Sequence, residues 1–384
     1  MKSYGVPLTA PEDLLNEHFK LKRAVLDEVF KHVKFSKSEK AHLKFSRGKR
    51  KELRDKLLRN WKFAKHYVDS AINSIIGLVK GWVQLYNKGK AKSKPEITKK
   101  TVYVKTTLFK VVNGKIKITI EPRKRYMEID LAKFDYLPKD YDSIGGLILK
   151  EDILIITFKK KVKQIRPKDC TSFDTNLTNI TGLINGRIVR FDLRELYHIR
   201  RVYEEKRRKI QKLSKTKPKT AKKLMRKYSK REKNRARDLM HKITTTIARE
   251  LVSIKHGAIL EDLRNVKDRI LDGSKNLNRK LSKWNCRMFQ FMLEYKLRWF
   301  GLPVKHVNPA NSSKTCPFCS GSLAAYRGRF MKCSNCGLIA DRDVVAVLNL
   351  RMWGLGVTPN GDEPLKGDVS QSGRMSYQMS AEPP

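Results

Sequence analysis

The chain has 384 residues, a length that predicts two or three domains. Because 40% of the residues are hydrophobic and 9% are aromatic, the chain can form hydrophobic cores and is not a disordered polycation. With 85 lysines and arginines against 38 aspartates and glutamates, the formal net charge of +47 indicates a polyanionic partner: nucleic acid, an anionic membrane or an acidic protein. No apolar run reaches the roughly 18 residues of a membrane helix, and the first residues lack the apolar core of a signal peptide, so we expect a cytoplasmic, nucleoid-associated protein that binds nucleic acid and no membrane.

Residues 1–95 are predicted to be mostly helical. Apolar residues recur there at the three- and four-residue intervals that are typical of amphipathic helices. They form two stripes: Leu15, Phe19, Leu26, Val29 and Val33, then Leu57, Trp61, Ala64, Tyr67, Val68, Ala71, Ile72, Ile75, Val79, Trp82 and Tyr86. The segment between the stripes, residues 37–51, is polar and basic and is predicted to connect the two helical runs.

Residues 96–165 are predicted to form a small antiparallel β domain, because the composition changes near residues 89–95. Ile116, Ile118 and Ile120 alternate with polar residues, which indicates a strand with one buried face. The Asn-Gly pair at 113–114, just before this strand, is typical of a tight hairpin turn.

Strands and helices alternate over residues 166–308, which indicates a mixed α/β layer. Strands are predicted at 172–183, 187–191, 258–260 and 303–307, and helices at 193–213, 243–254 and 289–300. Asn185 and Gly186 are predicted to form a turn between the first two strands, and Pro218 to break the helical run. Gly257 is predicted to end the helix before it, as a C-terminal glycine does.

Residues 200–238 contain 19 lysines or arginines and 4 acidic residues, a net charge of +15 (19 minus 4). Apolar residues at helical spacing indicate that one face of these helices packs while the opposite face is cationic. A solvated surface would explain the charge, but a cationic helical face in so basic a chain favours contact with phosphates. Such contacts supply affinity without sequence information, so they do not identify the nucleic acid.

Four of the six cysteines lie in two Cys-x-x-Cys pairs, Cys316 with Cys319 and Cys333 with Cys336. Each pair can chelate a metal, and the 13 residues between the pairs allow both to close on one tetrahedral Zn²⁺. Four thiolates leave no open position, so the predicted zinc is structural and not catalytic. The two other cysteines are isolated, which does not indicate a disulfide framework.

Three acidic residues follow apolar segments in the way expected of ligands at strand ends. Asp174 lies within a predicted strand, Glu261 directly follows another, and Asp343 begins an apolar helix. Carboxylates so placed can hold two divalent cations that activate water and stabilise the leaving oxygen in phosphodiester cleavage. The three residues are far apart in the chain, so only folding could join them, and each alone is also compatible with an ordinary strand end or helix cap.

The order of these features resembles that in the TnpB proteins of insertion sequences, relatives of the type V CRISPR effector nucleases. Residues 173–179, 259–263 and 341–349 are similar to the three RuvC motifs of the family, and residues 315–319 and 332–337 to its zinc ribbon. A basic helical segment separates the first two motifs and the ribbon precedes the third, as in the family. The similarity extends over almost the whole chain before its C-terminal tail.

The resemblance implies an α+β multidomain fold: a helical recognition lobe, a β-barrel wedge domain, and a RuvC-like nuclease core of RNase-H type with an inserted zinc ribbon. The domains would be 1–95, the recognition lobe with an N-terminal strand of the wedge domain; 96–165, the wedge domain; 166–308, the nuclease core with its basic helical hairpin; 309–338, the four-cysteine ribbon; 339–355, the end of the core; and 356–384, a tail. The tail is rich in Gly, Pro, Ser and Asp, which predicts disorder.

The resemblance also implies an RNA-guided DNA endonuclease. Its guide RNA would come from the transposon end and pair with double-stranded target DNA beside a short adjacent motif, so that base pairing reads the sequence. Asp174, Glu261 and Asp343 would hold two Mg²⁺ ions and catalyse cleavage, while the four cysteines hold zinc. Asp341 is the rival for the third ligand; Asp343 is preferred because it heads the Ala-x-x-Asn pattern of the third motif.

The chain departs from the family pattern in two places. The family usually has Gly where Asn176 stands, and we expect Asn176 to adopt the left-handed backbone that Asn tolerates. The third motif usually reads Asn-Ala-Ala, where this chain has Val345, Ala346 and Val347, so a polar group near the metals is missing. Three other functions stay open: a guided binder or repressor that does not cut, a transposase that joins DNA strands, and a basic zinc-ribbon RNA-binding protein without chemistry.

Overall fold

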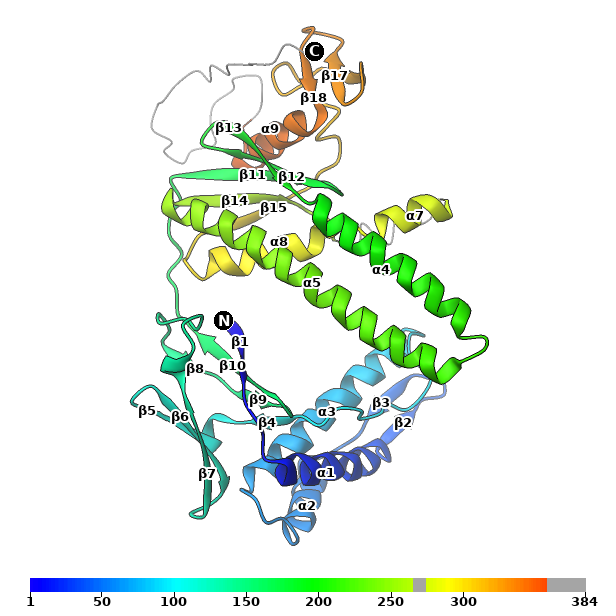
Figure 1. Cartoon of the computed structure of the whole chain (residues 1–384), viewed down its shortest axis with the longest axis vertical. Coiled ribbons are helices and arrows are strands. Elements are labelled where there is room, and N and C mark those ends of the chain that lie inside the picture. Colours follow the sequence, from blue (N-terminus) through cyan, green and yellow to red (C-terminus); the bar gives the residue numbers. More distant parts are fainter. Residues whose placement is uncertain (265–273, 358–384) are drawn as a thin grey trace. The chain divides into compact units, whose positions relative to one another are not determined.

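The computed structural model describes residues 1–264 and 274–357. The chain divides into two compact units, Met1–Lys161 and Val162–Pro384, each with its own core (Figure 1). Nearly all of the predicted tail, residues 358–384, lies outside the described residues. None of the described helices combines the length and the apolar content that crossing a membrane requires.

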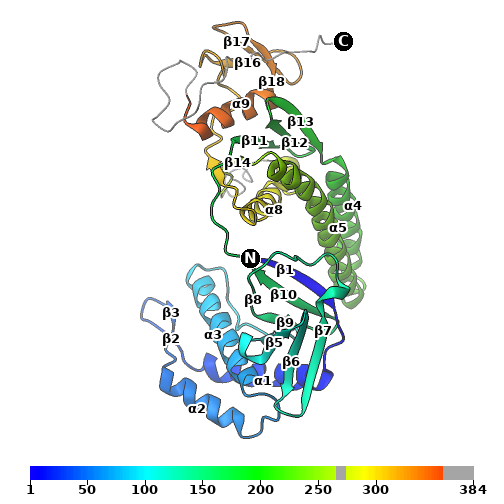
Figure 2. The same cartoon turned by 90° about the vertical axis from the view of Figure 1, so that its left-hand side faces the viewer.

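The first unit contains helices at both apolar stripes, but the second stripe is divided between two helices, and residues 59–65, which include Trp61 and Ala64, are not helical. The helices are α1 (Glu12–Phe30), α2 (Arg47–Leu58) and α3 (His66–Asn87) (Figure 2). Their apolar faces meet in one core in which Val29 and Ile72 are buried, so the helical prediction is confirmed for these segments.

The connection predicted at residues 37–51 contains more structure than expected. Strands β2 (Val33–Phe35) and β3 (Ala41–Leu43) form a hairpin. Helix α2 then begins inside the segment, where the Oγ atom of Ser46 accepts a hydrogen bond of 3.3 Å from the backbone N–H of Lys49 and caps the helix. The hairpin was missed because strands of three residues are too short to show an alternation.

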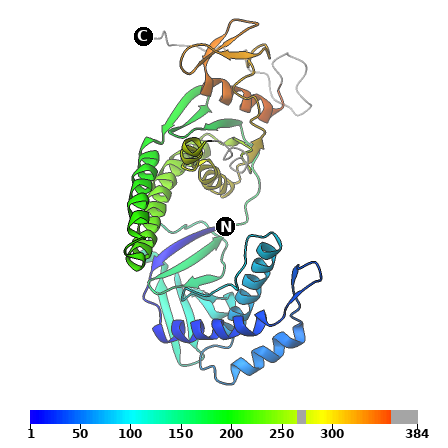
Figure 3. The same cartoon turned by 90° about the vertical axis from the view of Figure 1, so that its right-hand side faces the viewer.

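The remaining strands of the first unit form two sheets (Figure 3). One sheet has the order β1-β10-β9-β4, with β8 beside β10, and the other has the order β5-β6-β7. The strands are β1 (Lys2–Pro7), β4 (Val102–Val104), β5 (Phe109–Val112), β6 (Lys115–Glu121), β7 (Arg125–Asp130), β8 (Ser143–Ile144), β9 (Leu147–Leu149) and β10 (Ile153–Lys159).

The predicted β-barrel is wrong for the described part of the chain, where these strands do not close into one ladder. Strands β4, β8 and β9 have only two or three residues, too few backbone groups to continue a ladder around a barrel. The predicted hairpin is confirmed: Asn113 and Gly114 have φ angles of 50° and 72°, and β6 buries Ile116, Ile118 and Ile120.

The second unit is built on a five-stranded mixed sheet of order β13-β12-β11-β14-β15. Its strands are β11 (Asp169–Thr175), β12 (Asn179–Ile184), β13 (Arg187–Asp192), β14 (His256–Glu261) and β15 (Val304–Val307). Strands β11, β12 and β13 are antiparallel neighbours, whereas β11, β14 and β15 are parallel. The mixed α/β layer predicted for this region is therefore confirmed.

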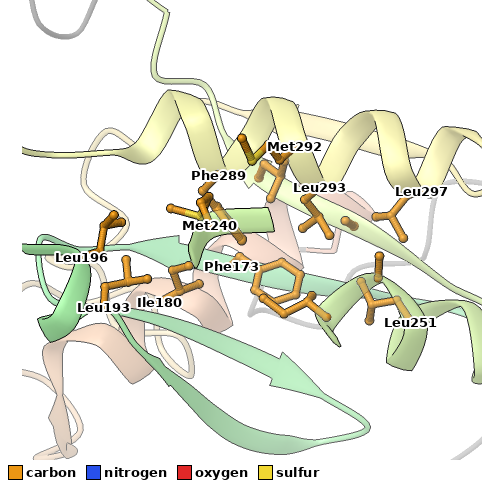
Figure 4. Packing of buried hydrophobic residues seen from close by; sticks show 14 of the residues in the cluster. Phe173, Ile180, Leu193, Leu196, Met240, Leu251, Phe289, Met292, Leu293 and Leu297 are labelled. Atoms are coloured by element: carbon orange, nitrogen blue, oxygen red, sulfur yellow. The ribbon is translucent and has the colours of Figure 1, made fainter. Parts of the chain in front are cut away.

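Helices cover both faces of this sheet (Figure 1). The described helices of this unit are α4 (Arg194–Leu213), α5 (Pro218–Ser253), α7 (Lys275–Leu281), α8 (Cys286–Arg298) and α9 (Arg342–Leu355), of which α4 packs against α5. Helices α5 and α8 pack on one face, where Phe173 meets Phe289 edge-on with ring centroids 5.9 Å apart (Figure 4). Helix α9 packs on the opposite face.

Two details differ from the sequence prediction. The strand predicted at 172–183 is divided between β11 and β12 by a turn at 176–178. Gly257 does not end a helix, because it lies inside β14, and Lys255 takes the left-handed conformation with a φ of 57°. A Cβ atom on Gly257 would stand 3.0 Å from the Sγ atom of Cys170 and 3.1 Å from the carbonyl oxygen of Pro303, so close strand packing explains the glycine.

Candidate functional site

The four predicted zinc ligands lie together in a small antiparallel sheet of β16 (Leu323–Ala325), β17 (Phe330–Cys333) and β18 (Ile339–Asp341) and its flanking turns. Their sulfur atoms all lie within 4.8 Å of one another. The Sγ atoms of Cys316 and Cys336 are 3.6 Å apart, and those of Cys319 and Cys333 are 3.5 Å apart. Thiolates around one tetrahedral zinc stand roughly 3.8 Å apart, so the cluster fits a structural zinc.

The backbone around the cluster favours thiolates. The N–H of Asn335 donates to the Sγ atom of Cys333 at 3.4 Å, and the N–H of Cys336 is the main cause that lowers the pKa of Cys333 to about 6. Gly337 has a φ of 73°, a left-handed conformation that glycine adopts readily in the tight turn after the second pair. The backbone therefore favours the thiolate of Cys333 in particular.

Asp174 and Glu261 come together at the carboxyl ends of β11 and β14. These strands are parallel and Phe173 pairs with Leu260, so the next residue of each strand stands beside the other. The backbone N–H of Thr175 also donates to the Oε2 atom of Glu261 at 3.2 Å. Because Phe173 and Leu260 face the core under α5 and α8, alternation directs both carboxylates to the face covered by α9.

Asp343 reaches the same place from the first turn of α9, and its side chain is only 4% exposed. Its Oδ1 atom pairs with the guanidinium of Arg329, and its Oδ2 atom is buried without a hydrogen-bond partner. Helix α9 packs on β11 and β14, which carry Asp174 and Glu261, and repulsion from Asp343 is, after burial, a cause of the raised pKa of Asp174. The structure thus brings the three predicted residues to one region.

The electrostatics of this region favour a cation. Burial, and then the charge of Asp343, raises the pKa of Asp174 to about 6. Burial, and then the charge of Asp174, raises the pKa of Glu261 to about 8. A divalent cation would supply the missing positive charge and favour the ionised carboxylates. Within the described residues, only the four thiols are gathered within 4.8 Å; the three carboxylates are spaced more widely.

Asp341 is engaged elsewhere. Its Oδ1 atom accepts a hydrogen bond of 2.8 Å from the backbone N–H of Asp343 and caps α9. Its Oδ2 atom lies 3.0 Å from the Nη2 atom of Arg190. Both oxygens of Asp341 therefore have structural partners, whereas one oxygen of Asp343 has none.

Asn176 contacts the carboxylate of Asp174 through its side chain. Its Nδ2 atom donates to the Oδ2 atom of Asp174 at 2.8 Å and to the Oδ1 atom of Asn179 at 3.1 Å. Its φ angle is not positive, so the expected left-handed backbone is wrong. A turn with ordinary φ angles already joins β11 to β12 here, and the amide is left free to orient Asp174.

Two further side chains hold the strand ends, a role that was not predicted from the sequence for either of them. The Nε1 atom of Trp284 donates to the carbonyl of Thr175 at 2.8 Å, and the Nε2 atom of Gln290 donates to the carbonyl of Glu261 at 2.8 Å. Both come from α8 or the residues just before it. No local pattern distinguishes them, because Trp and Gln at helical spacing are ordinary packing residues.

The valines of the third motif are core residues. Val345 and Val347 are fully buried; Val345 packs with the apolar residues around the cysteines, and the carbonyl of Val347 accepts a hydrogen bond of 2.6 Å from Ser172. The Nδ2 atom of Asn349 donates to the carbonyls of Ser312 and Thr315 at 2.7 and 2.8 Å. The motif therefore joins α9 to the start of the ribbon.

The basic segment predicted at 200–238 forms the hairpin of α4 and α5. Its packed face includes Glu232, which is 5% exposed and pairs with Arg207 and, at 3.1 Å, with Arg200. All the other lysines and arginines of the segment are exposed. The predicted division into a packed face and a cationic face is confirmed.

Parts of this chain are similar to known protein families and to curated relatives. The model of the Uncharacterized protein MJ0013 family matches residues 14–119, and that of the Cas12f1-like, TNB domain matches residues 287–350. TnpB-like protein MJ0751 of Methanocaldococcus jannaschii is 40% identical over 256 residues, which cover 63% of this chain and 92% of that protein. TnpB-like protein MJ1635 of the same organism is 32% identical over 337 residues, covering 86% and 79%.

Two solved structures share the fold. The Cas12f1-sgRNA-target DNA complex is 15% identical, with a TM-score of 0.60, covering 88% of this chain and 81% of that one. CasPhi-2 (Cas12j) bound to crRNA is 12% identical, with a TM-score of 0.56, covering 95% and 99%. At these identities the likeness concerns the fold, a mixed α+β multidomain architecture.

Proposed function

The chain belongs to the TnpB-like protein family, and from this premise we propose that it is an RNA-guided DNA endonuclease. The guide RNA comes from the transposon end and pairs with double-stranded target DNA beside a short adjacent motif. Among the similar structures, Cas12f1 is bound to an sgRNA and target DNA, and CasPhi-2 to a crRNA, which supports partners of this kind. Base pairing then reads the sequence, and the protein binds the backbone.

One observation carries the proposal of cleavage: the buried carboxylates of Glu261 and Asp343 and the half-buried carboxylate of Asp174 lie at one end of the sheet, and one oxygen of Asp343 has no partner. Asp174, Glu261 and Asp343 would hold two Mg²⁺ ions. When bound, the ions supply an activated water and offset the charge of the scissile phosphate. Asn176 orients Asp174, and Asp341 caps α9 and so orients Asp343. These hydrogen bonds hold the ligands in place before metal arrives.

The rest of the chain positions nucleic acid. The cationic face of α4 and α5 contacts phosphates and supplies affinity without sequence preference. The zinc of the ribbon is structural. We propose that the functional domains follow the predicted boundaries: recognition lobe 1–95, wedge domain 96–165, nuclease core 166–308 and 339–355, and ribbon 309–338.

The test begins with expression of the protein together with its native flanking DNA and sequencing of the RNA that co-purifies. The complex is then incubated with Mg²⁺ and a plasmid that carries the matching target beside a randomised flank. We expect one dominant RNA and cleavage that requires the guide match. Asp174→Asn should abolish cleavage while RNA and DNA binding persist.

Asp343→Asn and Asp341→Asn form a matched pair two residues apart. The first should abolish cleavage, because it removes a metal ligand; the second should reduce it less, because Asn also caps helices. Cleavage that survives Asp343→Asn would contradict the assignment of the third ligand.

The other outcomes identify the alternatives. A defined RNA and targeted binding without cleavage in any metal would indicate a guided binder or repressor. Joined rather than cut DNA would indicate a transposase. Heterogeneous RNA with no targeted binding would leave a basic zinc-ribbon RNA-binding protein.

A further inference from the structure

The ribbon loop, residues 326–330, carries Arg329 to the start of α9. A hydrogen bond of 3.0 Å from the backbone N–H of Tyr326 to the carbonyl of Phe330 closes the loop, and Gly328 takes a left-handed φ of 56°. The backbone N–H of Arg342 donates to the carbonyl of Arg329 at 2.9 Å, which ties the loop to the first residue of the helix. The position of Arg329 is therefore defined by backbone contacts on both sides.

Arg329 covers Asp343 from the solvent side. Its Nη2 atom pairs with Oδ1 of the carboxylate; the arginine side chain is 56% exposed, whereas that of Asp343 is buried. Within residues 1–264 and 274–357, Arg329 is the ion-pair partner of Asp343. One carboxylate oxygen is thus bound to a cation that can swing away into solvent, and the other has no partner.

The guanidinium supplies part of the positive charge that the carboxylates need. Buried carboxylates without a counter-ion are unstable, so a cation of the protein itself is favoured when no metal is bound. A divalent ion on Asp343 would repel a guanidinium at contact distance, so each of the two cations weakens the binding of the other to this carboxylate.

We propose that Arg329 and the divalent cation compete for Asp343, so that metal binding at the proposed active site displaces the ribbon loop. Arg329 is in this respect a positioning residue: it holds the ligand when metal is absent and leaves when metal binds. The proposal rests on the proposed function, because it requires a cation at Asp343. The proposal also predicts the direction of the change in metal affinity: removal of Arg329 strengthens metal binding, which a merely structural role would not produce.

The test measures Mn²⁺ binding to the full-length, zinc-loaded protein by titration calorimetry, with Asp343→Asn defining the heat that belongs to the site. Arg329→Ala should lower the Mn²⁺ dissociation constant by about five-fold or more, a typical coupling between linked ligands. Arg327→Ala is the matched control: it removes the same charge from the same loop, but its guanidinium lies over the ring of Tyr326 at 5.5 Å. Arg329→Lys, which keeps a charge with a weaker grip, should give a smaller decrease.

A second measurement uses the unaltered protein, so it stands even if the variants fold poorly. Amide hydrogen exchange across residues 326–333 should become faster at saturating Mg²⁺, because the loop loses its contact with Asp343. An unchanged or weaker Mn²⁺ affinity in Arg329→Ala, or unchanged exchange, would overturn the competition while Asp343-dependent binding upheld the proposed function. If no Asp343-dependent binding occurs in either protein, both proposals fail.

Discussion

The indole N–H of Trp284 donates a hydrogen bond of 2.8 Å to the backbone carbonyl of Thr175, one residue after Asp174. The neighbouring residue, Lys283, pairs at 2.7 Å with Glu204 of the basic hairpin. The segment that leads into α8 therefore holds the end of β11 and also contacts the helix proposed to bind phosphates. The hydrogen bond from Trp284 to Thr175 gives the first of four predictions.

Trp284→Phe removes the indole donor and keeps most of the packing. We expect the rate of single-turnover cleavage to fall about ten-fold at saturating RNA and DNA, because the end of β11 loses its support and a small displacement of a catalytic group is costly. Trp61→Phe is the control, since Trp61 donates an equivalent bond of 3.2 Å to Ala64 in the first unit. Equal losses in both variants would show that the effect is general destabilisation.

The stability of the protein without Mg²⁺ should depend on pH through Asp174 and Glu261. Their pKa values are raised from 3.8 to about 6 and from 4.5 to about 8, so the folded state binds more protons than the unfolded state between these limits. The contribution of these two carboxyl groups to the free energy of unfolding is therefore complete below about pH 4 and is lost as the pH rises to about 8. Urea unfolding of the zinc-loaded protein from pH 5 to 8.5 measures this slope.

The Glu261→Gln variant should show a flatter slope between pH 6 and 8 than the unaltered protein. Asp262→Asn is the matched control: Arg264 lowers the pKa of Asp262 to about 2, so this group does not titrate in that range. Identical slopes in all three proteins would contradict the assignment of the raised pKa to Glu261.

Removal of zinc should disturb α9 as well as the ribbon. Val345 of α9 and Ala340 pack in the same cluster as Cys316 and Cys333. Cys333→Ser should abolish bound zinc and lower the Tm of the second unit by about 5–10 °C, because structural zinc contributes folding free energy. Metal analysis and calorimetry measure both effects. Cys170→Ser, outside the cluster, should retain about one zinc; loss of zinc there would contradict the assigned ligands.

The cationic face of the hairpin should determine the salt dependence of RNA binding. Replacement of Lys222, Lys223 and Lys230 by Gln removes three exposed charges from α5. The slope of log K against log salt concentration should decrease by about two to three, close to one for each lost phosphate contact. The same three positions changed to Arg keep the charge and should keep the slope. An unchanged slope in the Gln variant would place the RNA on another surface.

Much of this protein can be predicted from local pattern. The two cysteine pairs predict one zinc cluster because each pair closes over two residues, and the structure gathers their sulfurs within 4.8 Å. The alternation of Ile116, Ile118 and Ile120 predicts a strand and its buried face for the same reason: the interactions that decide it lie within a few residues. The order of the motifs over the whole chain predicts the family.

The tertiary structure decided which side chains meet. Asp174, Glu261 and Asp343 come from two strands and a helix, and no local pattern states that these elements share one sheet end. The structure also separated Asp343 from Asp341, since only three-dimensional contacts show that Asp341 is occupied by a helix end and by Arg190.

The tertiary structure also decided other features that the sequence pattern does not state. They are the open sheets of the first unit, the side-chain role of Asn176 and the contacts of Arg329 and Trp284. Each depends on a partner brought close by packing rather than by chain neighbours. Secondary structure and chelating pairs follow from short-range sterics and spacing, which the sequence by itself determines. A site assembled from distant segments follows from the burial of the core, which positions its side chains only when the whole unit has folded.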